Sequence, residues 1–438
     1  MKQFFCSRWR SVRLASLFHE NTVKNEDFLL SNALQFRYGS IVQKKKFDLT
    51  SDLIETYKKY TLIQPGDIMI NGLNLNYDFI TQRVALVPST GIITSAYICL
   101  RPRNSVNYRF YTYYLKALDA LKVFNGLGTG IRLTLSYDSI KNMVLPLPPR
   151  EEQDQIVRYL DWQVSKINRL IAAKRKEIAL LHEQHKRRIS EAVLHGNDDG
   201  CCQKDSGVEW IGMIPEHWSV IRCKYVFTER DERSIAGEEE HLSMSQKYGL
   251  VPDSKLDERR MLSESYVGGK VCYKNDLVLN RLKAHLGVFA LSPQKGVISP
   301  DYTVLIPSAE RILPTYGEAV LKNDLCRREL RIRVRGIIEG FWRLYTDDFS
   351  TIVIPLPPLK EQEQIMKHLS ALNNKFTALK QRLEQEINIL HELRTRLISD
   401  VVTGQIDVRG IKVPDDEYIN NEITEEEFEE ESENNEEE

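Results

Sequence analysis

Two groups of basic, amide and aromatic side chains in this 438-residue chain have the chemistry needed to contact a nucleic acid. Arg or Lys can hydrogen-bond guanine in the major groove, Asn or Gln can bond adenine, and either cation can hold a phosphate. The first group contains Arg37, Tyr38, Lys44, Lys45, Lys46, Asn71, Asn74, Asn76 and Tyr77. The second contains Lys247, Tyr248, Arg281, Lys283, His285, Arg331, Arg333 and Arg335. For any single member a solvated surface role is the simpler interpretation, so the hypothesis depends on the two sets.

No group of residues indicates catalysis. The glycine-rich stretch Phe124–Gly130 lacks the preceding strand and the following acidic residue of a dinucleotide site, and there is no Walker lysine. The tetrapeptides of base methylation (Asn-Pro-Pro-aromatic or Asp-Pro-Pro-aromatic) and the protease, esterase and kinase motifs do not occur. Among seven cysteines there is no Cys-x-x-Cys pair. Adjacent Cys201 and Cys202 are better explained as residues without a metal-binding role than as zinc ligands. We therefore expect no catalytic residue, no metal site and no cofactor in this chain.

The distribution of charge indicates a polyanionic partner. The formal net charge is −2, but residues Pro414 to Glu438 contain 14 acidic side chains and no Lys or Arg. The rest of the chain therefore carries a net charge of +12. The acidic stretch has too little apolar content to fold, and we interpret it as a solvated tail, with an internal mimic of DNA as the alternative.

Length and hydropathy limit the classes of protein to which this chain can belong. With 438 residues and 42% hydrophobic content the chain can form two to three domains. The start has no apolar core of a secretory signal, and no uncharged apolar run is long enough to span a bilayer. We expect a cytoplasmic protein with no membrane partner.

Two long helices, which begin at nearly identical motifs, are the elements that would position the two groups. The motifs are Leu145–Leu160 (LPLPPREEQDQIVRYL) and Ile354–Leu369 (IPLPPLKEQEQIMKHL). Proline at a helix start and carboxylates beside its positive end are signals of a helix N-terminus. Each helix would contain about 45 residues and measure about 65 Å at 1.5 Å per residue.

Apolar residues recur at intervals of three and four along both helices, as in a coiled-coil seam. In the second helix they are Ile365, Leu369, Leu372, Phe376, Leu379, Leu383, Ile387, Leu390, Leu393, Leu397 and Val401. In the first helix, where Lys174 and His185 interrupt the stripe, they are Ile156, Leu160, Val164, Ile167, Leu170, Ile171, Ile178, Leu181, Ile189 and Val193. The two helices can pair with each other. The residues that we expect at the helix-pair or partner interface are Ile156, Leu160, Ile167, Leu181, Ile365, Leu369, Leu372, Phe376, Leu379, Leu383 and Leu390.

The same offset of 209 residues relates positions between the helices, so the chain is a tandem repeat of a globular module followed by a long helix. Trp9 corresponds to Trp218, Asp67 to Asp276 and Asn71 to Asn280. Strand-like runs are expected at 67–70, 83–87 and 97–100, and again at 276–279, 287–291 and 302–306. A helical stretch is expected in each module, around 110–123 and 314–330. Each module is then a small α+β domain of about 150 residues.

The chain resembles the specificity subunit of type I restriction-modification systems. The two Pro-Leu-Pro-Pro and Glu-Gln helix starts, the two long helices, the opening Gly207–Trp218 and the stretch from Gly128 (GTGIRLTL) carry the likeness. The opening has no full counterpart before Trp9, which leaves the edge of the first module in question.

The resemblance implies two target recognition domains joined by two long helices in an antiparallel intramolecular coiled coil, with pseudo-twofold symmetry. The expected parts are recognition domain 1 (1–148), helix 1 (149–197), recognition domain 2 (198–357), helix 2 (358–404) and a disordered acidic tail (405–438). Each domain would read one half of a split DNA site. Two methyltransferase subunits would bind the chain, and restriction subunits would join through them, with S-adenosylmethionine, ATP and Mg²⁺ used by these partners.

Two alternatives remain open at this point. A specificity subunit of a type IIB or IIG system would look similar, and neighbouring genes would separate the two. A coiled-coil scaffold without a role in DNA binding would tolerate long helices, but it gives no reason for two divergent modules or a body of charge +12.

Overall fold

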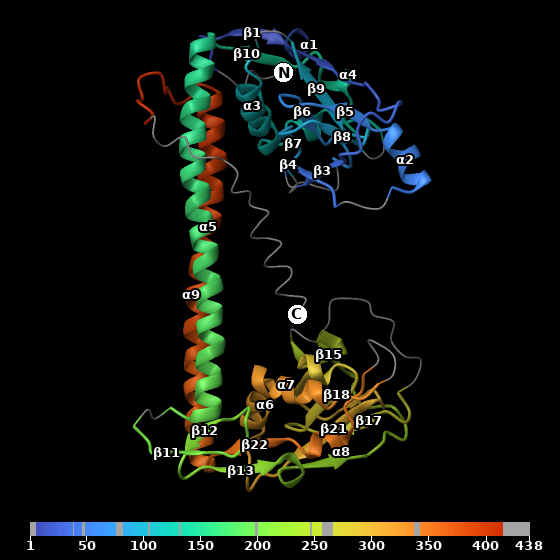
Figure 1. Cartoon of the computed structure of the whole chain (residues 1–438), viewed down its shortest axis with the longest axis vertical. Coiled ribbons are helices and arrows are strands. Elements are labelled where there is room, and N and C mark those ends of the chain that lie inside the picture. The colour runs from blue at the N-terminus through green and yellow to red at the C-terminus, as the bar shows by residue number, and fades with distance from the viewer. Residues whose placement is uncertain are drawn as a thin grey trace. The chain divides into compact units, whose positions relative to one another are not determined.

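The computed structural model describes residues 6–37, 39–45, 49–75, 82–103, 106–130, 133–197, 200–245, 248–255, 266–336 and 342–414, apart from the side chain of His285. The chain forms two compact units (Figure 1). Unit 1 contains Met1–Lys176 and Leu383–Glu438, and unit 2 contains Glu177–Arg382. Helices α5 (Arg150–His195) and α9 (Leu359–Val402) each contribute one half to each unit. We call the part of unit 1 before α5 module 1, and the part of unit 2 between α5 and α9 module 2.

Module 1 is built on an antiparallel sheet of order β2-β9-β6-β7, formed by β2 (Phe18–Glu20), β9 (Ile98–Pro102), β6 (Ile68–Ile70) and β7 (Val84–Leu86). Three two-stranded ladders surround it: β1 (Arg10–Arg13) with β10 (Val144–Leu147), β3 (Leu34–Arg37) with β4 (Ser40–Gln43), and β5 (Thr61–Ile63) with β8 (Gly91–Ile93). The helices are α1 (Leu14–Leu17), α2 (Ser51–Lys58), α3 (Tyr108–Ala120), η1 (Phe124–Gly126) and α4 (Tyr137–Ile140).

Both faces of the sheet are buried along β6, β7 and the first part of β9, which explains why these strands read as continuous apolar runs rather than as alternating ones. Ile68 and Ile70 lie in the cluster that includes Phe110 and Tyr111 of α3. Met69, which points to the other face, lies in a second cluster with residues of the β3–β4 ladder.

Module 2 repeats this architecture in an antiparallel sheet of order β14-β21-β18-β19, formed by β14 (Phe227–Arg230), β21 (Tyr302–Pro307), β18 (Leu277–Asn280) and β19 (Phe289–Leu291). Its ladders are β13 (Ser219–Arg222) with β22 (Val353–Leu356), β15 (Leu242–Ser245) with β16 (Gly249–Pro252), and β17 (Lys270–Cys272) with β20 (Gly296–Ile298). An extra hairpin, β11 (Gln203–Asp205) with β12 (Met213–Pro215), precedes them. The helices are η2 (Cys223–Tyr225), η3 (Asp253–Lys255), η4 (Ala284–Leu286), α6 (Pro314–Lys322), α7 (Asp324–Ile332) and α8 (Thr346–Ser350).

The strand pairing confirms the tandem repeat inferred from the sequence. Arg10 pairs with Leu147 where β1 meets β10, and Ser219 pairs with Leu356 where β13 meets β22, so both partners are shifted by 209 residues. The α+β fold class is therefore confirmed. The six expected strands overlap β6, β7, β9, β18, β19 and β21.

The helical stretch expected around 314–330 is confirmed, and the structure divides it into two helices, α6 and α7. Asn323 has φ −60° and ψ 137°, ends α6, and accepts a hydrogen bond from the backbone N–H of Leu325 through its side chain. Asn is a strong helix N-cap because its short side chain can replace a missing backbone acceptor, so it breaks the apolar pattern here.

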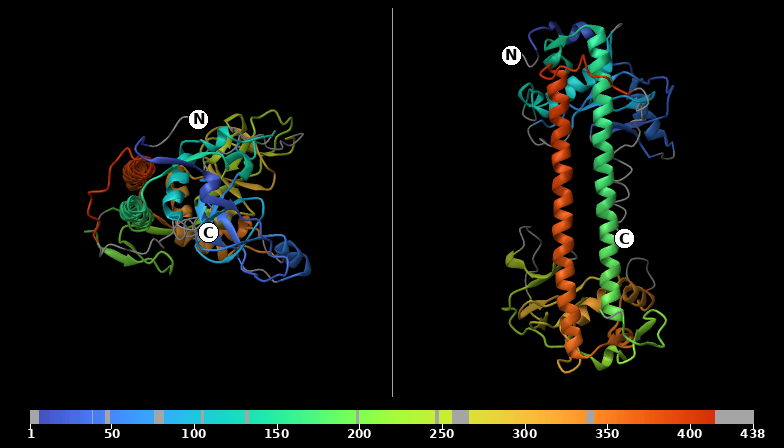
Figure 2. Two further views of the ribbon diagram at one scale, coloured as in Figure 1. Left: turned by 90° about the horizontal axis from the view of Figure 1, so that it is seen from above. Right: turned by 90° about the vertical axis from the view of Figure 1, so that its left-hand side faces the viewer.

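The two long helices are antiparallel within each unit. In unit 1, Asn168 bonds Arg394 at 2.7 Å, and Lys174 pairs with Glu386 at 2.9 Å. In unit 2, the ring of His185 stacks on Phe376 with centroids 4.1 Å apart. Figure 2 shows the two helices side by side within each unit.

The buried seam differs in part from the expected one, because Leu170, Leu379 and Leu393 are exposed. Lys174 and His185, which interrupt the apolar stripe, instead lie in the seam with Glu386 and Phe376 as partners. A straight α-helix drifts by about 20° per heptad relative to a strict 3.5-residue repeat, so a stripe extrapolated over many turns leaves the buried face.

The segment after α9 belongs to unit 1, so the tail expected over 405–438 begins too early. Val408 is buried in the cluster that contains Trp9, and Gln155 of α5 donates hydrogen bonds to the carbonyl groups of Val408 and Ile411. In unit 2, Ile211 and Ile214 lie in the cluster that contains Trp218. The cluster around Trp218 is thus completed by residues that precede it in the chain. The cluster around Trp9 is completed by residues that follow α9. The acidic stretch from 415 onward lies outside the described residues.

Candidate nucleic-acid interface

A buried aspartate fixes the start of the central strand in both modules. Asp67 accepts the backbone N–H of Gln64 at 3.0 Å and pairs with Arg101 of β9 at 2.7 Å. Asp276 accepts the backbone N–H of Tyr273 at 2.8 Å and pairs with Arg230 of β14 at 2.9 Å. The carboxylates raise the pKa of the Arg101 and Arg230 guanidinium groups through these hydrogen bonds. The repeated aspartate is thus structural, with its cation supplied by different strands.

A repeated asparagine fixes the loop that follows the same strand. The Oδ1 atom of Asn71 accepts the backbone N–H of Leu73 at 3.1 Å, and Oδ1 of Asn280 accepts that of Leu282 at 3.1 Å. Such turns are a common use of Asn because its side chain imitates a backbone carbonyl. Asn71, a candidate DNA contact, therefore uses one of its polar atoms to shape the loop.

Buried Arg83 holds the loop of module 1, a role that the sequence did not reveal. Its guanidinium group donates to the carbonyl oxygens of Asn71 (3.1 Å), Leu73 (2.8 Å) and Asn74 (3.4 Å). The backbone of Asn74 has φ +52° and the residue is exposed, so its side chain is displayed on a fixed support. The sequence signal that could have indicated this support is an arginine directly before an apolar strand-like run, because arginine is seldom buried without partners.

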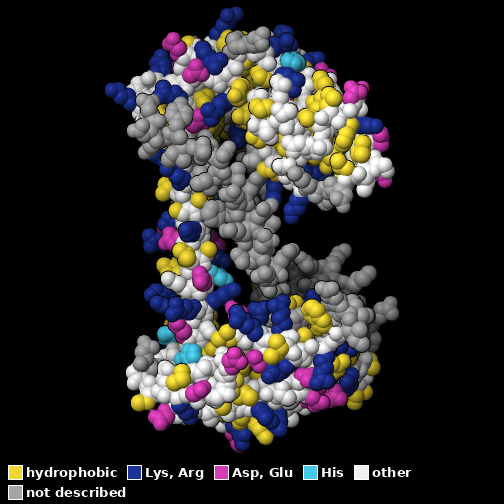
Figure 3. Space-filling view, viewed as in Figure 1, with side chains coloured by type: hydrophobic (Ala, Val, Ile, Leu, Met, Phe, Trp, Pro, Cys, Tyr) yellow, Lys and Arg dark blue, Asp and Glu magenta, His cyan; other side chains and the backbone are white. Residues whose placement is uncertain are grey.

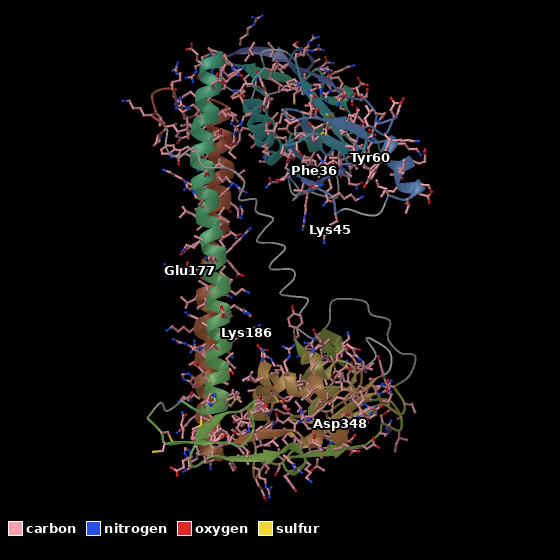
Figure 4. The ribbon with its side chains drawn as sticks, viewed as in Figure 1. Phe36, Lys45, Tyr60, Glu177, Lys186 and Asp348 are labelled. Atoms are coloured by element: carbon pink, nitrogen blue, oxygen red, sulfur yellow. The ribbon has the colours of Figure 1, made fainter. Side chains whose placement is uncertain are left out.

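The other described candidates of module 1 lie on the β3–β4 ladder. Arg37 is half-buried at the end of β3, Lys44 is half-buried after β4, and Lys45 is exposed. Figure 4 shows Lys45 pointing away from the module. Tyr38, Lys46, Asn76 and Tyr77 lie outside the described residues.

In module 2 the structure brings several of the predicted cations together. The backbone N–H of Leu344 donates to the carbonyl of Arg281 at 2.9 Å, and Arg335 and Arg343 form a β-bridge. These contacts place the loop after β18 beside the segment that follows α7. Figure 3 shows Lys and Arg side chains gathered on module 2 in this region.

Three arginines of this group also have partners within the protein. Arg281 donates to the carbonyl of Asp301 at 2.8 Å, Arg333 pairs with Glu329 at 2.6 Å, and Arg335 pairs with Asp348. Arg335 is exposed, and ion pairs at the surface contribute about 0–1 kcal/mol, so a phosphate can replace Asp348 as its partner at small cost. Tyr248, Lys283 and Arg331 are exposed, Lys247 lies outside the described residues, and the side chain of His285 is not described.

The residues proposed for the helix interface fall into three environments. Ile156 and Leu160 lie in the core of module 1, and Ile365 and Leu369 in that of module 2. Ile167 and Leu383 are buried, Leu181, Leu372, Phe376 and Leu390 are half-buried, and Leu379 is 40% exposed. The first turns of α5 and α9 are thus anchored to the modules.

The repeated Pro-Leu-Pro-Pro and Glu-Gln motif makes this anchor. Gln153 and Gln362 each donate at 2.8 Å to the carbonyl of the proline five residues earlier. The hydroxyl groups of Tyr111 and Tyr316 donate to Pro146 (2.8 Å) and Pro355 (3.4 Å) of the same motif. The last strand of each module is thereby tied to its long helix.

A family model described as "Type I restriction modification DNA specificity domain" matches residues 7–180 and 240–388. The chain belongs to this family. The resemblance seen in the sequence is confirmed, and the chain is a non-catalytic DNA-recognition subunit of the type I restriction-modification class.

Named relatives and a solved structure match over most of this specificity subunit. It is 23% identical to the type I restriction enzyme MjaVIII specificity subunit of Methanocaldococcus jannaschii, covering 92% of this chain and 94% of the relative. It is 21% identical to the EcoKI specificity subunit of Escherichia coli K12, covering 90% and 87%. A chain from a study of "complex assembly and conformational transition of the type I R-M system" has a TM-score of 0.57 at 16% identity, covering 92% of this chain and 99% of that one. That last likeness supports the fold.

Among the described residues, no helix is both long and apolar enough to cross a membrane. Within the ranges that the structure describes, no group of three or more His, Cys, Asp or Glu side chains is arranged to hold a metal ion.

Proposed function

We propose that each module of this specificity subunit reads one part of a two-part DNA site. The observation that carries the proposal is that one structural frame presents different polar side chains in the two modules. Asp67 and Asn71 in module 1, and Asp276 and Asn280 in module 2, make the same turns. The loops that follow these turns are equivalent in position, but their side chains differ: Asn74 in module 1 corresponds to Lys283 in module 2.

The two loops differ in the chemistry that they offer to a base. Module 1 displays Asn74 on the loop held by Arg83, and an amide can pair with adenine. Module 2 displays Lys283 beside the arginines of its loops, and these cations can bond guanine or phosphate. Each module would thus prefer its own base sequence.

We further propose that two methyltransferase subunits bind along α5 and α9, and that restriction subunits join through them. Large apolar side chains are exposed on both helices: Leu170 (53%) and Leu180 (51%) on α5, and Ile389 (63%) and Leu393 (51%) on α9. Ile389 and Leu393 are four residues apart and therefore share one face of α9, and neighbouring exposed apolar side chains mark protein interfaces. S-adenosylmethionine, ATP and Mg²⁺ would be held by those partners and not by this chain.

The reading function can be tested by single-molecule sequencing of modified bases. The subunit is expressed with its methyltransferase partner in a host that lacks its own adenine methylation. We expect methylation at one motif made of two specified parts with an unspecified spacer. A motif made of one contiguous part would contradict the proposal.

The recruitment function can be tested by copurification with a tagged methyltransferase subunit. Replacing Ile389 and Leu393 by Asp should abolish copurification, because a charge cannot be buried in an apolar interface without a partner. Asn388→Asp, at an exposed position beside Ile389, adds one such charge as a control and should leave binding intact. Equal binding by all variants would place the interface elsewhere.

A further inference from the structure

A thiol, an imidazole and a carboxylate form a hydrogen-bonded chain in unit 2. The Sγ atom of Cys201 lies 3.7 Å from Nδ1 of His217, and Nε2 of His217 lies 2.7 Å from Oε2 of Glu361. The three residues come from different elements: the segment after α5, the turn between β12 and β13, and the first turn of α9. The fold, and not the local sequence, brings them together.

The order of the three groups determines the direction of the hydrogen bonds. An ionised carboxylate only accepts, so Glu361 requires the proton of the neutral imidazole to be on Nε2. Nδ1 then carries a lone pair and faces the thiol of Cys201. A thiol beside a base that is itself oriented by a carboxylate is the arrangement that activates cysteine nucleophiles.

Unit 1 provides an internal comparison. Its equivalent positions, at an offset of 209, are Arg8 and Glu152, whose Nη2 and Oε1 atoms lie 2.7 Å apart. Arginine cannot accept a proton at any accessible pH. The contact with the helix start is therefore structural in both units, and unit 2 adds a base facing a thiol.

Four of the other cysteines contrast with Cys201, whereas Cys6 is, like Cys201, partly accessible. Cys99, Cys223, Cys272 and Cys326 are buried, and burial raises the pKa of the Cys99 thiol to about 12. Cys201 is partly accessible, and its neighbour Cys202 is more exposed. Accessibility alone therefore predicts faster reaction at Cys202, which makes that residue a matched control.

We propose that Cys201 is a reactive thiol and a site of covalent modification by hydroperoxides and alkylating agents. With a hydroperoxide, the sulfur attacks the terminal oxygen, so an S–O bond forms and the O–O bond breaks. Sulfur is oxidised by two electrons to sulfenic acid, the peroxide is reduced to an alcohol, and the thiol proton passes through His217 to the leaving oxygen. With iodoacetamide an S–C bond forms, iodide leaves, and His217 takes the proton.

The test measures alkylation of the full-length chain by iodoacetamide at pH 7, followed by peptide mass spectrometry. Because the two cysteines are adjacent, Cys202→Ser reports on Cys201 and Cys201→Ser reports on Cys202. We expect Cys201 to react about tenfold faster, since the reaction rate follows the thiolate fraction. Cys201 should likewise form sulfenic acid first when a small hydroperoxide is added, as detected with a dimedone probe.

Two further measurements separate activation from access. Adding His217→Gln to the Cys202→Ser chain should reduce the rate at pH 7 to that of Cys202, while the rates near pH 10, where thiols are ionised, should agree. If that variant fails to fold, the pH–rate profiles of the two single variants decide, and that of Cys201 should rise at lower pH. Equal rates for the two cysteines at pH 7, or coincident profiles, would overturn the proposal.

Discussion

Modules 1 and 2 have the same frame but differ in where their arginines lie. In module 1, Arg83 is 1% exposed and its guanidinium group supports the loop after β6 from inside. In module 2, Arg331 and Arg335 are exposed, and the equivalent loop carries Lys283 at the surface. The shared sheet and turns thus determine the position of each loop. The other residues of the loop are free to differ between the modules and to determine what the loop binds.

The largest expected effect tests whether the frames are equivalent. Trp9 and Trp218 are buried, and each packs against the glycine that follows a long helix, Gly404 or Gly196. Trp9→Ala and Trp218→Ala should each destabilise their own unit by about 3–5 kcal/mol, because a large core side chain is lost. Hydrogen-exchange mass spectrometry can read each unit separately. If only one substitution were destabilising, the two positions would not be equivalent.

The second prediction concerns the support of the module 1 loop. Arg83→Met should leave three backbone carbonyls without their donor and cost about 2–3 kcal/mol. We expect the methylated motif to become degenerate in the part read by module 1 and to stay unchanged in the other part. Arg13→Met, at an exposed position of β1, is the control. Loss of both parts would show that Arg83 acts on the whole subunit.

The third prediction separates phosphate contacts from base contacts. Lys283→Gln combined with Arg331→Gln should lower the slope of log K against log salt by about two, since each phosphate contact contributes about 0.9. Asn74→Ala in module 1 should weaken specific binding and leave the slope unchanged. Binding is measured on the assembled methyltransferase complex by fluorescence anisotropy. An unchanged slope in the double variant would place the phosphate contacts outside this region.

The smallest expected effect concerns the helix seam of unit 2. Burial lowers the pKa of His182, and the neighbouring Lys186, His185 and Lys380 lower it further. A histidine that is less readily protonated when folded costs stability as pH falls through its unfolded value of 6.5. His182→Gln should therefore reduce the loss of thermal stability between pH 7.5 and 5.5. A parallel loss in the variant and the parent would assign the acid sensitivity to other groups.

The sequence predicted those features that depend on repeated local patterns. The two helix starts, the tandem repeat and the α+β modules follow from the Pro-Leu-Pro-Pro and Glu-Gln motifs and the apolar runs. Helices α5 and α9 lie inside the ranges expected for them. The break at Asn323 was not predicted because a single capping side chain overrode the apolar spacing on both sides of it.

The candidate contacts were harder to predict because their roles depend on partners distant in sequence. Asn71 and Arg333 have the chemistry of DNA contacts, yet both are bonded to groups in their own module. Arg83 looked like part of a strand, and only the fold places the carbonyls of Asn71 and Leu73 around it. The chain Cys201, His217 and Glu361 is likewise assembled from residues far apart in sequence.

The central claim is that each module reads its own part of the DNA site. The most direct measurement exchanges residues 14–143 for the equivalent segment of a relative with a different target, which keeps the β1–β10 ladder and the start of α5. Methylated sites are then mapped by single-molecule sequencing of the host genome. The account predicts that one part of the motif changes to that of the relative while the other part stays the same. Changes in both parts, or in neither, would contradict it.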